Sequence, residues 1–233
     1  MVKQIPSVFN WSGGKDSTLA LHHVLKQKLY DVRYLLTTVN SSFNHIAMHG
    51  VREDLLIEQA NSLNLPLFQV HLPEMPDMGM YEKTMSEALF KIKAEGVTHS
   101  IFGDIFLEDL KVYRENQLAK IGMEAVFPLW KRDSLTIVKE FINLGYKTIV
   151  VCAQEDLKDF CGRVIDQSFL NDLPNHIDPC GENGEFHTFV FDGPIFNQPI
   201  NFEIGELVYK TFSSPNASNK SSGFWYIDLI PRA

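Results

Sequence analysis

The chain has 233 residues, and 21 lysines and arginines against 29 aspartates and glutamates give it a net charge of −8 at pH 7. Its apolar content of 45% is enough for a hydrophobic core and excludes a mainly disordered chain. The negative charge disfavours nucleic acid as a partner. Because no apolar run is long enough to cross a membrane and the first residues lack a signal-peptide pattern, we expect a soluble, cytoplasmic protein without a membrane partner.

Short β-like runs alternate with amphipathic helical stretches in residues 1–130. The expected strands cover residues 7–10, 34–39, 67–71, 98–102 and 125–127, and the helices between them end near residues 29, 63, 95 and 120. This alternation predicts an α/β fold in which five parallel strands are joined by crossover helices, as in Rossmann-like domains. In such a fold, ligands bind where the strands end.

The pattern changes near residue 130, so we divide the chain into residues 1–130 and residues 131–233. A helix over residues 135–142, capped by Asp133 or Ser134, and a strand over residues 148–152 open the second part. Residues 154–175 look mostly helical. Further strands are expected at residues 186–191, 202–204, 207–212 and 224–230, with a polar loop at residues 213–222. These elements predict a smaller α+β domain.

The segment S-G-G-K-D-S at residues 12–17 falls between the first expected strand and the first expected helix. At such a junction backbone N–H groups and the positive helix end converge on an anion, and glycines let the backbone approach a phosphate. Lysine adds a charge, hydroxyls donate to phosphate oxygens, and an aspartate can hold a bridging Mg²⁺. The alternative is a glycine turn before an ordinary capped helix. We assign phosphate binding to Ser12, Gly13, Gly14, Lys15, Asp16, Ser17 and Thr18, catalysis to Lys15 and Asp16, and the metal to Asp16.

The spacing of this segment differs from G-x-x-x-x-G-K-[ST] and from G-x-G-x-x-G. It resembles the SGGxDS loop of the PP-loop ATP pyrophosphatases, which cleave ATP between the α and β phosphates. The resemblance implies that residues 1–130 form a PP-loop/HUP-type domain that binds ATP with Mg²⁺, and that the chemistry is adenylation. The loop alone does not choose among tRNA thiolases, amidating synthetases and sulfonucleotide reductases.

Three further segments resemble the diphthine-ammonia ligase family and its bacterial relatives. They are G-D-I at residues 103–105 with Y-R-E at residues 113–115, L-W-K-R-D at residues 129–133, and C-G-E-N-G-E-F-H-T at residues 180–188. The last contains the G-E-x-G-E-[YF]-x-T signature, which the resemblance places in a substrate-binding second domain. Members that act on elongation factor 2 usually have Glu at His187, Gly at Asn183 and Ala at Asp104. These differences concern the acceptor more than the ATP chemistry.

Two carboxylates of this signature, Glu182 and Glu185, flank Gly184. Such a pair can hold an ammonium ion, deprotonate it, or share a metal, whereas a solvated acidic turn is the structural alternative. His187 is a candidate acid or base near neutral pH, or a packed side chain. We assign catalysis to Glu182, Glu185 and His187, and substrate binding to Glu182, Glu185 and Thr188.

Other candidates follow the ends of expected strands or lie on helices. His49, Gly103 and Asp104 are assigned to the nucleotide, with His49 near adenine or substrate and Asp104 near ribose or Mg²⁺. A helix N-cap is the alternative for Asp104. Arg114 and Arg132 are assigned to the substrate, where they can neutralise pyrophosphate or a carboxylate, although exposed basic residues are often merely solvated.

These assignments predict an ATP-dependent, AMP-forming amide ligase. An acceptor carboxylate, on a small molecule or a modified protein side chain, is adenylated and then attacked by free ammonia; a homo-oligomer is compatible with the sequence. One alternative is a PP-loop enzyme of tRNA thiolation or sulfonucleotide type, which the scattered Cys152, Cys161 and Cys180 fit poorly because no Cys-x-x-Cys pair occurs. The other is a non-catalytic adenine-nucleotide sensor.

Overall fold

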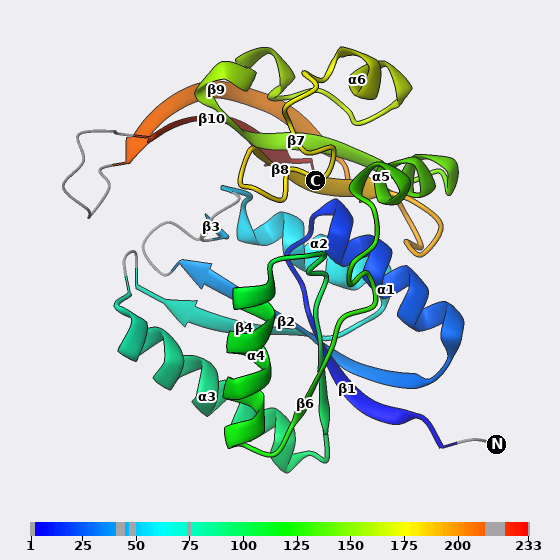
Figure 1. Cartoon of the computed structure of the whole chain (residues 1–233), viewed down its shortest axis with the longest axis vertical. Helices are drawn as coiled ribbons and strands as arrows, with labels where there is room; N and C mark the ends of the chain where they lie inside the picture. Colours follow the sequence, from blue (N-terminus) through cyan, green and yellow to red (C-terminus); the bar gives the residue numbers. More distant parts are fainter. Residues whose placement is uncertain (1–2, 41–44, 47–49, 74–75, 213–221, 233) are drawn as a thin grey trace.

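The computed structural model describes residues 3–40, 45–46, 50–73, 76–212 and 222–232. Two sheets are stacked with helices between them and on the outer faces (Figure 1). In the first sheet, five strands run parallel in the order β4-β2-β1-β5-β6, and β3 pairs antiparallel with the end of β2. The strands are β1 (Ile5–Asn10), β2 (Tyr30–Asn40), β3 (His45–Ile46), β4 (Leu67–Leu72), β5 (His99–Ile101) and β6 (Glu124–Val126).

Four helices cover this sheet, and the expected α/β fold with five parallel strands is confirmed. They are α1 (Lys15–Gln27), α2 (Glu53–Leu63), α3 (Met78–Ala94) and α4 (Glu108–Lys120). The central strand β1 buries three successive residues, Ser7, Val8 and Phe9, as expected for a parallel strand that is covered on both faces. In Figure 1, α3 and α4 lie on the outer face, and α1 and α2 lie between the two sheets.

The second sheet is antiparallel, with the strand order β8-β7-β10-β9. Its strands are β7 (Lys147–Gln154), β8 (Phe186–Asp192), β9 (Phe202–Phe212) and β10 (Ser222–Pro231). Helix α5 (Ser134–Asn143) precedes it, and Asp133 is the cap, because its carboxylate accepts from Thr136 N at 2.8 Å. This part is smaller than the first and mixes helix and strand, as expected.

Two expectations for the second part were wrong. Residues 154–175 contain only a 3-10 helix, η1 (Glu155–Phe160), and a short helix, α6 (Gln167–Asp172), because the chain between them returns to form a bridge from Val164 to Ile149. The expected break between residues 204 and 207 is absent. There, Gly205 and Glu206 form a bulge opposite Asp228, and β9 continues through it. The expected loop at residues 213–222 lies outside the described residues except for Ser222, which begins β10.

One hydrophobic core joins the two sheets. It extends from Phe9 on β1 through Leu21 and Leu56 on the intervening helices to Phe186 and Val190 on β8. A second core lies under α3 and α4 and includes Leu36, Phe102 and Leu118. Through the first core, the second sheet is packed directly on α1 and α2.

None of the helices in the described residues is long and apolar enough to cross a membrane.

Candidate functional site

A cavity of about 680 Å³ opens where β1, β2 and β5 end, and it extends between α3 and α4. One part of its lining comes from the glycine-containing loop together with residues 180–188, which lead into β8. The rest of its lining mixes polar side chains with apolar ones such as Leu36, Met85 and Phe102. Eight of the predicted site residues in the loop and in the signature segment at residues 180–188 line it: Ser12, Gly14, Lys15, Asp16, Ser17, Glu182, His187 and Thr188.

The loop at residues 12–17 leads from β1 into α1 and is held by its own hydroxyls. The Ser12 and Ser17 hydroxyl oxygens lie 2.9 Å apart, and Ser17 Oγ donates to Gly14 O at 3.0 Å. Thr18 Oγ1 donates to the same carbonyl at 2.8 Å, and Thr18 is fully buried away from the cavity. Ser12 and Ser17 line the cavity, whereas Thr18 does not and supports the loop from within the core.

Residue 13 must be a glycine, because its backbone conformation and its close neighbours leave no room for a side chain. Its φ is +76°, and a Cβ there would lie 2.7 Å from Gln59 Oε1. Gly103 meets the same loop from β5, because a Cβ there would lie 2.8 Å from the backbone nitrogen of Ser17. Both glycines thus permit close approach of backbone segments around the start of α1.

The second sheet holds the loop directly. Val190 N donates to Gly13 O at 2.9 Å, and Lys15 N donates to Thr188 Oγ1 at 3.1 Å. Lys15 Nζ also donates to the carbonyl oxygen of Cys180. The loop of the first domain is therefore positioned by residues of the predicted second domain, including the predicted substrate residue Thr188.

Lys15 and Asp16 form an ion pair in the part of the cavity lining that comes from the loop. Lys15 is 3% exposed, and its Nζ lies 2.7 Å from Asp16 Oδ2. Burial alone would lower the pKa of Lys15, but the Asp16 carboxylate outweighs it and holds that pKa above its usual value. The lysine therefore stays charged, as a fixed cation beside the loop.

The second oxygen of Asp16 fits a metal ion. Asp16 Oδ1 is buried and has no hydrogen-bond partner within the described residues. A buried carboxylate oxygen without a donor is costly, and Mg²⁺ commonly uses one or two carboxylates together with substrate phosphates. The described residues contain no group of three or more potential metal-binding side chains.

Asp104 and Arg114 pair with each other at the cavity wall. Arg114 Nε lies 2.8 Å from Asp104 Oδ2, and the guanidinium lies 4.3 Å from the Phe102 ring centre. Burial raises the pKa of Asp104, although Arg114 partly offsets this effect. Arg114 is thus anchored by a carboxylate, and any anion that binds it would compete with Asp104.

The two glutamates of the signature segment have different environments. Glu182 lines the cavity, and burial together with the Asp16 carboxylate raises its pKa to about 8. Glu185 turns into its own loop, where it accepts from Asp178 N at 3.1 Å and from Asn183 N at 2.9 Å. Burial opposes ionisation of Glu185, but these hydrogen bonds prevail and lower its pKa. Glu182 faces the cavity, and Glu185 holds the shape of its own loop.

His187 also lines the cavity, next to the loop-binding Thr188. Burial and the charge of Lys15 lower the pKa of His187 to about 4. The imidazole is therefore neutral at physiological pH, so it can accept or donate a hydrogen bond but carries no charge.

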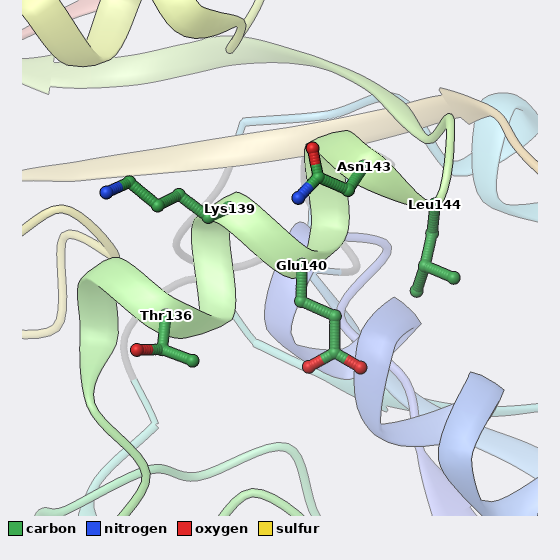
Figure 2. Close-up of a pocket in the computed structure, with 5 residues that line it drawn as sticks. All are labelled: Thr136, Lys139, Glu140, Asn143 and Leu144. Carbon is green, nitrogen blue, oxygen red and sulfur yellow. The ribbon is translucent and has the colours of Figure 1, made fainter.

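The structure does not bring Arg132 into the cavity. Its guanidinium donates to the Glu140 carboxylate and lies 3.1 Å from His23 Nε2. Figure 2 shows Glu140 projecting from α5 toward α1, beside a surface pocket of about 380 Å³ that is separate from the loop. Predicted residue His49 lies outside the described residues.

Gln59 on α2 is a loop contact that sequence reasoning missed. Its side chain is fully buried; Oε1 accepts from Trp11 Nε1 at 3.0 Å, and Nε2 donates to Gly13 O at 3.1 Å and Val190 O at 2.6 Å. One amide thus joins the loop to β8. A glutamine on the buried face of an apolar helix was the available signal, because buried amides require partners.

Replacing Gln59 with methionine is expected to weaken ATP binding about tenfold and to lower the free energy of unfolding by about 1–3 kcal/mol. The reason is that the Val190 carbonyl and the Trp11 indole would lose a buried partner and the loop would lose its support. Calorimetric titration with a non-hydrolysable ATP analogue measures the first effect, and urea unfolding the second. Gln69→Met, which removes a partly buried amide that binds Glu53, is the control; equal ATP affinity in both variants would refute the role of Gln59.

The three cysteines have protonated thiols. Cys152 and Cys180 are buried, and burial raises the pKa of Cys152 to about 11 and that of Cys161 to about 12. Burial also raises the pKa of Cys180, the cysteine in the cavity wall, above its usual value. Thiolates are the reactive form, so these environments disfavour sulfur chemistry at neutral pH.

The fold and the position of the loop are those of the α/β class of nucleotide-binding proteins, with a glycine-containing loop between a central strand and its helix. Residues 6–125 match the family model of the diphthamide synthase N-terminal domain, and residues 133–217 match that of the diphthamide synthase C-terminal domain. The chain belongs to the diphthamide synthase family.

Similar curated proteins are named diphthine–ammonia ligase. The relative from Schizosaccharomyces pombe is 22% identical over 218 residues, which cover 84% of this chain and 36% of that protein. The one from Danio rerio is 27% identical over 168 residues, covering 64% and 65%, and the human one is 25% identical over 125 residues, covering 51% and 46%. The chain thus matches between about a third and two thirds of the length of these relatives.

Proposed function

We propose that the protein is an ATP-dependent ligase that forms an amide from a carboxylate and ammonia and releases AMP and pyrophosphate. The observation that carries this proposal is the shared cavity: the Lys15–Asp16 pair and the carboxyl group of Glu182 face the same space beside the loop. The relatives named as diphthine–ammonia ligases support the same reaction class. Residues 1–130 would bind ATP, and residues 131–233 would complete the acceptor site.

In the first step, an acceptor carboxylate oxygen attacks the α-phosphorus of ATP and the bond to the β-phosphate breaks. The leaving pyrophosphate is bound by the Ser12 and Ser17 hydroxyls and by N–H groups at the start of α1 other than that of Lys15, which donates to Thr188. The Lys15 side chain contributes a fixed positive charge nearby. Asp16 Oδ1 would hold Mg²⁺, which neutralises phosphate charge when bound. The apolar wall at Leu36 and Phe102 would receive the adenine ring.

In the second step, ammonia attacks the carbonyl carbon of the acyl-adenylate, and the bond to AMP breaks. One proton must leave the attacking nitrogen. We assign this role to Glu182, which lines the cavity and whose raised pKa of about 8 makes its carboxylate a stronger base than that of an exposed glutamate. Neutral His187 can orient the nitrogen or the carbonyl by a hydrogen bond.

The proposal is tested by incubating the protein with ATP, Mg²⁺, ammonium chloride and either diphthine or a panel of small carboxylic acids, followed by ³¹P NMR. We expect AMP and pyrophosphate in equal amounts, formation of the amide only with ammonium, and a hydroxamate when hydroxylamine replaces it. Formation of ADP and phosphate, or ATP that stays intact with every acceptor, would refute the proposed reaction.

A further inference from the structure

Strand β9 forms the outer edge of the second sheet. It is 11 residues long and, within the described residues, pairs only with β10. The free backbone groups of such an edge can pair with another strand, and proteins usually shorten or cover long edges. Ile204, Leu207 and Val208 on this strand are 60%, 38% and 42% exposed. A long open edge with exposed apolar side chains indicates a surface that another strand covers.

We propose that two copies of this chain pair through β9. The strands run antiparallel about a two-fold axis at Val208, and the two four-stranded sheets become continuous. An isologous contact of this kind uses the same residues of both copies, so the edge must be complementary to itself.

The charges on β9 select this register. In an antiparallel pair, two directly opposite residues turn their backbone groups either both toward the shared edge or both away from it, whereas neighbouring residues of one strand turn opposite ways. A residue of β9 therefore cannot lie opposite its own neighbour, and the two-fold axis must pass at one residue of β9. An axis at Val208 places Glu206 opposite Lys210 twice and Val208 opposite Val208. An axis at Glu206 opposes two glutamates, and an axis at Leu207 or Tyr209 leaves both charges opposite uncharged residues. Unlike charges directly opposite stabilise a strand pair, and like charges destabilise it.

Within the described residues, neither Glu206 nor Lys210 forms an ion pair. Lys210 Nζ lies 5.3 Å from the centre of the Tyr226 ring, and no acidic partner is present among the described residues. Glu206 lies in the bulge opposite Asp228, which is itself paired with Arg52. By contrast, the other glutamate of the strand, Glu203, already binds Arg232. The two charges left over are thus the two that meet in the proposed register.

The proposed contact lies close to the cavity without entering it. Lys210 is directly opposite Phe224 on β10, and Phe224 lines the cavity. Pairing at β9 would therefore place the partner strand one strand away from this wall, while the residues assigned to ATP come from a single copy. The inference does not depend on the reaction proposed above.

Cysteine cross-linking tests the register. Opposite Cα atoms in an antiparallel pair lie about 4.5–5.5 Å apart, which is within the reach of a disulfide. Val208→Cys is therefore expected to give a covalent dimer under mild oxidation, and Leu207→Cys, whose two copies would be separated by more than about 7 Å, is the matched control. Equal cross-linking of both variants, or none at Val208→Cys, would overturn the proposed register.

Charge reversal tests the interface in the otherwise natural chain. Sedimentation equilibrium of the natural protein should show a dimer. Glu206→Lys should raise the dissociation constant about tenfold, and the double variant Glu206→Lys with Lys210→Glu should restore it to within a few-fold. A monomer at all concentrations, or a dimer that Glu206→Lys leaves unchanged, would overturn the proposal. Far-UV circular dichroism confirms that each variant is folded.

Discussion

Replacing Asp16 with asparagine is expected to lower the rate of AMP formation by about a hundredfold or more, with little change in the fold. Asp16 Oδ1 is a buried cavity carboxylate oxygen that lacks a hydrogen-bond donor within the described residues, and unlike Asp104 Oδ2 it does not lie against an arginine. Asparagine has nearly the same shape but no charge, so it cannot hold Mg²⁺ against the phosphates or balance Lys15. Turnover is measured as AMP release at saturating ATP, with the Mg²⁺ concentration varied.

Asp192→Asn is the matched control for this experiment. Asp192 also forms a lysine pair, with Lys147 Nζ at 2.8 Å, but it lies at the end of β8 outside the cavity. It should leave turnover unchanged. If Asp16→Asn kept the natural rate and the natural dependence on Mg²⁺, the assignment of Asp16 as metal ligand would be wrong.

Replacing Glu182 with glutamine is expected to remove a pH-dependent step from the reaction. The pKa of Glu182 is raised to about 8, so the natural enzyme gains its ionised base as the pH rises through that value. The variant should be slower above pH 8, and its remaining pH dependence should follow ammonia alone. Rates measured from pH 6 to 9 at a constant concentration of unprotonated ammonia isolate the effect.

Glu185→Gln provides the contrast within the same loop. Its carboxylate accepts hydrogen bonds from Asp178 N and Asn183 N, so this variant should mainly lower stability and leave the pH dependence near 8 in place. If instead Glu185→Gln removed that dependence and Glu182→Gln kept it, the roles assigned to the two glutamates would have to be exchanged.

The raised pKa of Glu182 should also make the free energy of unfolding depend on pH. Because burial raises its pKa from 4.5 to about 8, the native state keeps a proton that the unfolded chain has released between these values. The unfolded state therefore binds fewer protons there, and the free energy of unfolding falls as the pH rises from about 4.5 to about 8. Relative to Glu182→Gln, the natural protein should lose stability across that interval in urea unfolding. If the free energies of unfolding of the two proteins changed equally with pH, the raised pKa of Glu182 would be contradicted.

The fold could be predicted to a large extent because its signals are local. Strand and helix periodicity placed the five parallel strands, and the loop at residues 12–17 is a continuous segment at one junction. The bulge in β9 could not be predicted, because Gly205 interrupts the alternation in the same way that a turn would. Helical content near residues 154–175 was overestimated, since pairing of Val164 with Ile149 is a tertiary contact.

The candidate site was less accessible from sequence because it depends on contacts between distant segments. Glu182 and Glu185 are three residues apart and look equivalent, yet only the folded loop shows which one faces the cavity. Gln59 donates to the carbonyl oxygen of Gly13, which is 46 residues away in the sequence. Arg132 binds Glu140 on α5 and therefore does not reach the cavity. The assignments at residues 12–17 and 182–188 therefore remain predictions that the variants above can test.

The most direct test of the central claim is a crystal structure with Mg²⁺ and an ATP analogue whose bridge between the α and β phosphates cannot be cleaved. We predict that the β and γ phosphates bind the loop at residues 12–17, with the metal on Asp16 and the α-phosphorus open toward Glu182. A nucleotide bound elsewhere, or one with its γ-phosphate directed at Glu182, would contradict the proposed chemistry.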